Sequence, residues 1–138
     1  MKSINQLRDE IHEIAKSKGF WDKPREIGTL LMLCVSELAE AMEADRNESY
    51  CQMERFNRIL VSSRIINNDP TYTGEITRDQ AWAVNFETCI KDTFEDELAD
   101  TVIRILDLCG AKGIDIEKHI ELKMKYNATR EMLHGKKY

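Results

Sequence analysis

Two pairs of acidic residues stand out because the members of each pair are spaced by about one turn of helix. Glu37 and Glu40 form the first pair, and Glu97 and Asp100 form the second. Residues three apart on a helix lie on the same face, so each pair places two carboxylates side by side. Two such pairs that faced each other across a helical bundle would surround a small volume with oxygen donors. This ligand set suits a hard cation such as Mg²⁺ or Mn²⁺.

The first pair lies at an unusual place on its helix. At about 100° per residue, Glu37 falls within the arc that holds Leu30 and Cys34, and Glu40 lies at the edge of that arc. An acidic side chain on an apolar face costs free energy unless it is paired or binds a metal. The position of Glu37 therefore favours a cation site over a solvated surface.

The second pair is open to two interpretations. The apolar side of its helix is predicted to hold Leu98, Val102, Ile105, Leu106 and Cys109. Glu97 and Asp100 fall on the opposite side, together with Arg104 and Asp107. One interpretation is a solvated face on which Asp100 pairs with Arg104. The other is a face that looks into a polar cavity, and periodicity does not choose between them.

Helices are the elements predicted to position these acids. Apolar residues at helical spacing predict a first helix over residues 3–18, which Gly19 ends. A second helix is predicted over residues 24–46, with Pro24 in its first turn.

The C-terminal part of the chain predicts two more helices. One starts near Asp92 or Thr93 and continues to Gly113, and Thr93 with Asp96 resembles a weakened capping box. Asp115 is expected to cap the last helix, which ends near Gly135.

These elements predict an all-α fold with a four-helix-bundle core in a single domain over residues 1–138. An insertion, about residues 47–92, separates the second helix from the penultimate one. Within it, residues 50–66 read as a helix, residues 67–70 as a break and residues 71–77 as strand-like.

Composition narrows the class of protein. A formal net charge of −5 and a pI near 5.3 argue against a protein that wraps nucleic acid. No apolar run reaches the length of a membrane span, and the first residues lack the apolar segment of a signal peptide. The four cysteines contain no C-x-x-C pair. The expected location is the cytoplasm.

Three motifs, taken in order, resemble the all-α nucleoside triphosphate pyrophosphohydrolases of the MazG type. The runs LLMLCVSELAEAMEADR and EDELADTVIRILDL look like the two acidic helices of that family. Lys123, Asn127 and Arg130 are similar to its C-terminal phosphate-facing motif. The match covers most of residues 1–46 and 93–138. The chain departs from the family at Ser36, where many members have a further Glu, and in its longer connection between the acidic helices.

The resemblance implies hydrolysis of a nucleoside triphosphate between the α and β phosphates, giving a monophosphate and pyrophosphate. The cation, Mg²⁺ or Mn²⁺, would be held by Glu37, Glu40, Glu97 and Asp100. A bound divalent cation neutralises phosphate charge and lowers the pKa of a water molecule. Glu40 is the candidate general base.

The remaining substrate contacts are also implied by the resemblance. Lys123, Asn127 and Arg130 recur at four and seven residues, which suits binding of phosphate oxygens from one helix face. The alternative is a solvated basic helix end. His12 and Trp21 match, by position, family residues that contact the nucleobase. Packed aromatic side chains are the alternative there.

Two rival classes remain. A carboxylate-bridged di-iron bundle needs Glu-x-x-His on two helices, and the sequence offers only Glu131 with His134. A non-catalytic metal-binding or oligomeric helical scaffold would explain the apolar helix faces but not the position of Glu37. A bundle this small is expected to form a homodimer or homotetramer. No motif identifies the preferred base.

Overall fold

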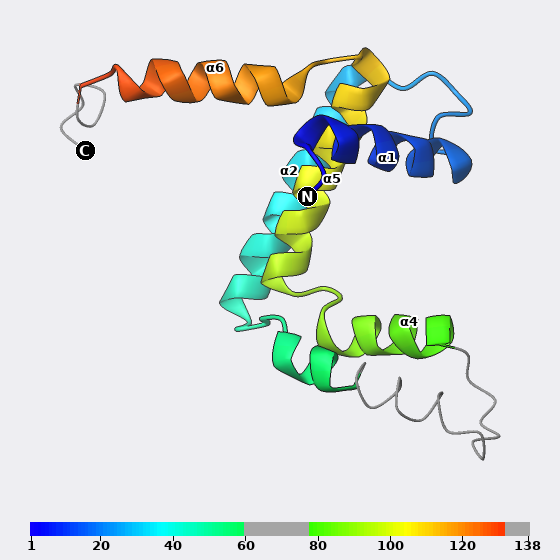
Figure 1. Ribbon diagram of the computed structural model, residues 1–138. Helices are drawn as coiled ribbons and strands as arrows, with labels where there is room; N and C mark the ends of the chain where they lie inside the picture. The colour runs from blue at the N-terminus through cyan, green and yellow to red at the C-terminus, as the bar shows by residue number, and fades with distance from the viewer. Residues whose placement is uncertain (60–77, 132–138) are drawn as a thin grey trace. The chain divides into compact units, whose positions relative to one another are not determined.

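Within residues 1–59 and 78–131, which the computed structural model describes, all regular secondary structure is α-helical (Figure 1). The helices are α1 (Ile4–Ser17), α2 (Ile27–Arg46), α4 (Arg78–Cys89), α5 (Phe94–Lys112) and α6 (Ile116–Ala128). Residues 53–59 are also helical. The predicted all-α class is confirmed for this part of the chain, and the four-helix core stays a prediction. None of these helices is long and apolar enough to cross a membrane.

The insertion is described only in part. The predicted break at 67–70 and the strand-like stretch at 71–77 lie outside the described residues. So does the predicted helix over 50–66 beyond residue 59, and in the described part it begins at Met53. Helix α4 was not predicted, because its residues show no clear apolar periodicity.

The chain divides into two compact units. Unit 1 comprises Met1–Leu30 and Ile103–Tyr138, and unit 2 comprises Leu31–Val102. Each unit therefore contains a part of α2 and a part of α5.

Helix α1 forms as predicted, because both of its ends carry strong local signals. The backbone N–H of Gln6 donates to the Ser3 hydroxyl at 3.2 Å, and the backbone N–H of Ser3 donates to the Gln6 amide oxygen at 2.8 Å. This reciprocal pair is a capping box. At the other end Gly19 adopts a φ of +80°, which an L side chain rarely tolerates.

Helix α2 begins three residues later than predicted. Residues 24–26 are not helical, and the first turn is closed by the bond from the Leu30 N–H to the Glu26 carbonyl oxygen at 3.1 Å. The Arg25 guanidinium instead lies over the Trp21 ring, 5.9 Å from its centroid. Contact with the preceding turn therefore holds this segment outside the helix.

In unit 2, α2 has a narrow buried face with helical spacing. Its members are small or acidic: Cys34, Glu37, Ala41 and Ala44. The buried residues at the start of α5 are Thr93, Glu97 and Thr101, each four residues after the last. The predicted apolar side of α5 is wrong here, since Leu98 and Val102 are exposed. The buried side of α5 is polar here because it lies against the face of α2 that carries Glu37.

The start of α5 also corrects a predicted cap. The Thr93 N–H bonds to the Ile90 carbonyl oxygen at 3.2 Å rather than to Asp96, and the Thr93 hydroxyl donates to the same oxygen at 2.6 Å. Asp96 does accept, from the backbone N–H of Asp92 at 3.1 Å. At the far end Gly113, with a φ of +62°, follows the last helical residue as predicted.

The described part of the insertion builds a small aromatic cluster within unit 2. Trp82 stacks on Phe86 with ring centroids 5.2 Å apart, and Phe56 meets Trp82 edge to face at 6.2 Å. The backbone N–H of Gln52 donates to the Cys89 carbonyl oxygen at 2.8 Å, which joins the two helical segments. Trp82 and Phe86 thus pack against each other in this cluster.

Helix α6, in unit 1, is capped by Asp115 as predicted. The Asp115 carboxylate accepts from the Lys118 N–H at 3.0 Å and from the Asn5 side-chain amide at 2.7 Å, which ties α6 to α1. The helix ends at Ala128 rather than near Gly135. The Thr129 N–H bonds to the Tyr126 carbonyl oxygen at 3.1 Å, an i→i−3 bond that tightens the last turn.

Candidate functional site

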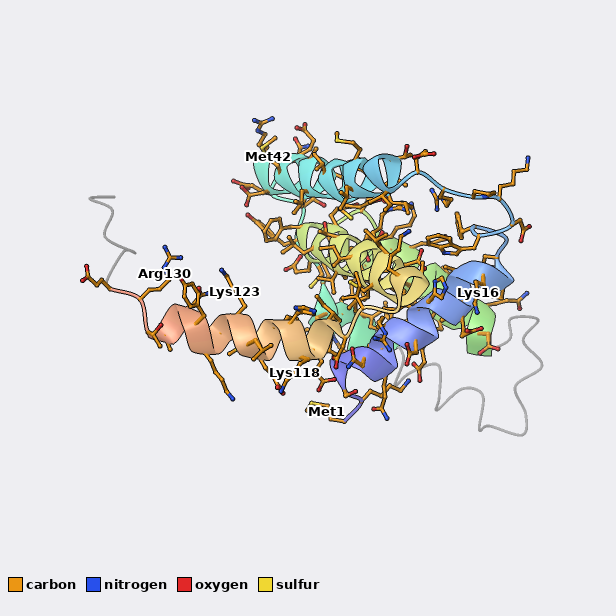
Figure 2. The ribbon with its side chains drawn as sticks, turned by 90° about the horizontal axis from the view of Figure 1, so that it is seen from above. Met1, Lys16, Met42, Lys118, Lys123 and Arg130 are labelled. Carbon is orange, nitrogen blue, oxygen red and sulfur yellow. The ribbon has the colours of Figure 1, made fainter. Side chains whose placement is uncertain are left out.

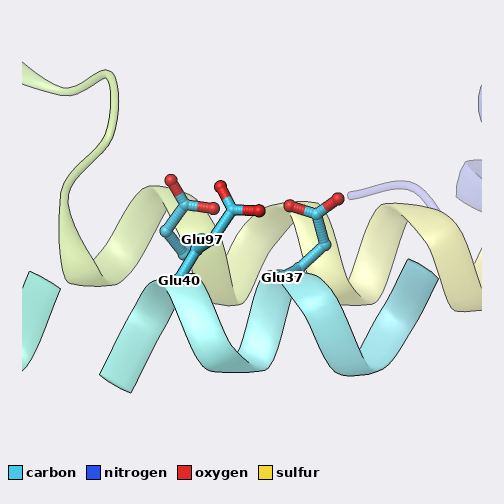
Figure 3. A group of neighbouring side chains, drawn as sticks. All are labelled: Glu37, Glu40 and Glu97. Carbon is cyan, nitrogen blue, oxygen red and sulfur yellow. The ribbon is translucent and has the colours of Figure 1, made fainter. Parts of the chain in front are cut away.

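Three glutamates converge in unit 2. Glu37 and Glu40 project from α2 and Glu97 projects from α5 (Figure 3). One carboxylate oxygen from each of the three lies within 4.8 Å of the others. The predicted pairing of acids from two helices is therefore observed for three of the four residues.

Burial distinguishes the three acids. Glu37 and Glu97 are 6% and 5% exposed, whereas Glu40 is exposed. The solvated-face interpretation is wrong for Glu97, because its side chain turns toward α2. A solvated face would leave it open to water. Burial of two carboxylates beside a third is costly unless a proton or a cation offsets the charge.

The electrostatics of the cluster appear in the pKa of Glu97. Burial, which has the largest effect, and the negative charges of Glu40, Glu37 and Asp100, in that order, together raise this pKa from 4.5 to about 7. A carboxyl group with this pKa retains a proton near neutral pH. A divalent cation that displaced the proton would relieve the same repulsion.

Asp100 lies apart from the other three acids. It is exposed on α5, and it is not among the residues whose carboxylate oxygens lie within 4.8 Å of one another. Its charge nevertheless reaches Glu97, since it contributes to the raised pKa of that residue. Its role as a metal ligand stays a prediction.

An open cavity of about 380 Å³ borders the cluster. Glu40 and Glu97 form part of its lining. The other lining residues come from the end of α2, the following turn and the segment before α5: Glu43, Ala44, Asn47, Ser49 and Asp92. A group that reached this cavity would meet the exposed carboxylate of Glu40 directly.

The predicted phosphate-binding residues lie on and after α6, in unit 1. Lys123 and Asn127 are exposed on the helix, while Arg130 lies beyond its end (Figure 2). The prediction that all three share one helix face is therefore wrong, because the helix stops at Ala128. The Lys123 ammonium and the Arg130 guanidinium lie 5.2 and 5.9 Å from the centroid of the Tyr126 ring.

The two predicted base-contacting residues, also in unit 1, meet at a third residue. Asp107 lies 2.7 Å from Nδ1 of His12, and it accepts the indole N–H of Trp21 at 2.9 and 3.1 Å. The His12 and Trp21 rings pack edge to face with centroids 5.2 Å apart. Sequence reasoning assigned no role to Asp107. The available signal was its place on the polar side of its helix.

A cavity of about 250 Å³ lies beside Asp107. Its wall is mainly apolar, with cationic side chains among the lining residues: Ile11, Ile14, Ala15, Lys18, Phe20, Arg25, Ile103, Arg104 and Asp107. An apolar cavity with a few polar groups is the common form of a site for a small organic ligand.

Comparison of the chain with protein-family models, with curated proteins and with solved structures found no match. Together, fold and site define an all-helical chain, in its described part, with a cluster of three glutamates of which two are buried.

Proposed function

We propose that the chain is a Mg²⁺-dependent nucleotide pyrophosphohydrolase of the MazG type. It would hydrolyse a nucleoside or deoxynucleoside triphosphate to the monophosphate and pyrophosphate. The observation that supports this most directly is the convergence of Glu37, Glu40 and Glu97 from two helices. Three close carboxylates, two of them buried, destabilise a hydrophobic core, but they form a suitable ligand set for a hard cation.

The donor set fits Mg²⁺ better than a softer metal. Every ligand atom in the cluster is a carboxylate oxygen, and neither His nor Cys belongs to it. Glu37, Glu40 and Glu97 would hold the ion, with Asp100 as the fourth proposed ligand. When bound, the cation supplies charge neutralisation and a more acidic water. Mn²⁺ takes the same ligands and is expected to substitute.

Glu40 is the proposed general base. It is the exposed member of the cluster, and it lines the open cavity. A base must reach the water whose proton it takes, and an exposed carboxylate satisfies that condition better than a buried one.

The other residues proposed to bind substrate all lie in unit 1. Lys123, Asn127 and Arg130 are proposed to bind phosphate oxygens, and their exposure leaves them accessible to an anion. His12 and Trp21 are proposed to contact the base, supported by their packing against each other. An aromatic ring held in a fixed orientation is a suitable surface for a planar base.

The surface of α2 in unit 2 supports self-association. Five large apolar side chains on this helix are about half exposed: Leu31, Met32, Val35, Leu38 and Met42. These side chains form an exposed apolar stripe, and such a stripe usually marks a surface that a partner covers. We therefore infer a homodimer or homotetramer. The same surface would serve a non-catalytic scaffold, which is the second candidate function.

A panel of canonical and modified nucleoside triphosphates, each with Mg²⁺, tests the enzyme. Pyrophosphate release is expected for at least one nucleotide, together with an equal amount of the monophosphate. Glu97→Gln should abolish that release, and Glu87→Gln, an exposed acid on α4, should not. Release at background for every nucleotide, with Mg²⁺ and with Mn²⁺, would reject the enzymatic proposal.

Titration with Mg²⁺ separates the enzyme from a scaffold that binds no metal. The enzyme requires a cation-dependent rise in melting temperature that Glu37→Ala removes. A melting temperature that changes neither with the cation nor with the substitution would favour the scaffold.

A further inference from the structure

Asp107 joins two rings that come from different parts of unit 1. His12 lies on α1, Trp21 lies in the turn after α1, and Asp107 lies on α5. The side chains of His12 and Asp107 are only 16% and 14% exposed. A carboxylate with so little exposure to water depends on hydrogen-bond donors from the protein. The two donors to Asp107 are both ring N–H groups.

The chemistry of the three groups assigns the protons. The indole nitrogen of Trp21 is only a donor, so the Asp107 oxygens that it meets are acceptors. The ionised carboxylate has no proton to give, so Nδ1 of His12 must carry the one in their 2.7 Å contact. In a neutral imidazole the other nitrogen, Nε2, is then an acceptor.

Close neighbours restrict the positions that the His12 and Trp21 rings can take. A Cβ added at Gly110 would lie 2.6 Å from the Cβ of His12, so α5 approaches α1 as closely as a glycine allows. The guanidinium of Arg25, four residues after Trp21, lies 5.9 Å from the centroid of the Trp21 ring. Both rings are therefore held by contacts beyond the hydrogen bonds themselves.

We propose that Asp107 is the positioning residue of the base site: it fixes the tautomer of His12 and the orientation of Trp21. With the imidazole neutral, a ligand group that meets Nε2 of His12 is an N–H or O–H donor. The inference rests on the proposed function, because His12 and Trp21 are its base-contacting residues.

Three variants test the positioning role without any ligand. Asp107→Leu removes both acceptors in a side chain of similar size. Asp107→Asn can keep its amide oxygen where both rings donate. Asp9→Leu makes the same change at an exposed acid of α1, which accepts from Arg8. A melting curve of each variant establishes that it folds.

The readouts are the ¹⁵N shifts of the His12 ring and the exchange rate of the Trp21 indole proton. Asp107→Leu should redistribute His12 between its tautomers and accelerate indole exchange roughly tenfold or more. Asp107→Asn and Asp9→Leu should leave both readouts near wild type. Trp82, in unit 2, provides an internal reference. Unchanged His12 and Trp21 signals in folded Asp107→Leu would overturn the proposal.

Binding of a non-hydrolysable α,β-imido nucleotide then tests the connection to the ligand. Its dissociation constant should rise roughly tenfold in Asp107→Leu, less in Asp107→Asn, and not in Asp9→Leu. Equal affinity of the wild type and Asp107→Leu would overturn the role in binding. Tight binding without hydrolysis in the wild type would instead reject the proposed reaction while leaving the role of Asp107 intact. Absence of binding by the wild type would overturn the base site.

Discussion

The carboxylate of Glu97 on α5 lies within 4.8 Å of the carboxylate of Glu37 on α2, and both side chains are almost completely buried. The neighbouring helix surfaces hold small residues, which lets the acidic faces approach. Two like charges at this distance oppose folding unless one is neutralised. Folding and cation binding are therefore expected to be linked through this pair.

Glu97→Gln should stabilise the chain when no divalent cation is present. The amide removes one of the mutually repelling charges, and we expect a gain of about 1 kcal/mol or more at pH 8. The same substitution should abolish the stabilisation by Mg²⁺, which for wild type reaches about 2.7 kcal/mol at a hundredfold excess over the dissociation constant. Urea unfolding with chelator and with Mg²⁺ measures both effects.

Glu87→Gln is the control for this prediction, since Glu87 is an exposed acid of the same unit. Its curves should follow those of wild type. A Glu97→Gln protein that still gained stability from Mg²⁺ would contradict the assignment of Glu97 as a ligand.

The raised pKa of Glu97 predicts a pH dependence of stability. The folded chain binds its proton up to a pH of about 7, whereas the unfolded chain releases it near pH 4.5. Between these values the folded state holds more protons, so stability falls as the pH rises. The metal-free chain should lose up to about 3 kcal/mol between pH 5 and pH 8.

Unfolding free energies of wild type and Glu97→Gln, measured with chelator from pH 5 to pH 8, isolate this group. The difference between the two curves should widen with pH. Parallel curves would mean that Glu97 titrates normally in the folded chain. Adding Mg²⁺ should flatten the wild-type curve, because the cation replaces the proton.

Gly110→Ala should destabilise unit 1. Its new methyl group would meet the Cβ of His12 at 2.6 Å, and neither atom is at the end of a flexible side chain. We expect a loss of about 1–3 kcal/mol and faster exchange of the Trp21 indole proton. Gly28→Ala on α2 is the matched control. No atom lies within 4 Å of its added Cβ, so it should be neutral or slightly stabilising.

Val35→Lys should weaken self-association without unfolding the chain. Val35 lies in the exposed apolar stripe of α2, and a charge there would have to be buried in an interface. Sedimentation velocity should show wild type as a dimer or tetramer and the variant shifted toward monomer. Met124→Lys, at an exposed apolar residue of α6, should behave as wild type. A wild type that sediments as a monomer at all concentrations would reject the interface.

Local chemistry made several elements predictable from the sequence. The stop at Gly19 and the Asp115 cap each depend on hydrogen bonds or dihedral angles within a few residues. The place of Glu37 among apolar neighbours on α2 was readable for the same reason, since helical spacing alone defines that face. Helix ends without such signals, at Ile27 and Ala128, were misplaced.

Tertiary structure decided which acids belong together. Glu97 had the pattern of a solvated residue, and it is buried because α2 presents Glu37 and Glu40 opposite it. The contacts of Asp107 also depend on the tertiary structure, since its partners lie far away in the sequence. Spacing along a helix defines which residues share a face. Only the packing of a second element determines whether the acidic side chains on that face are solvated, protonated or in contact with a ligand.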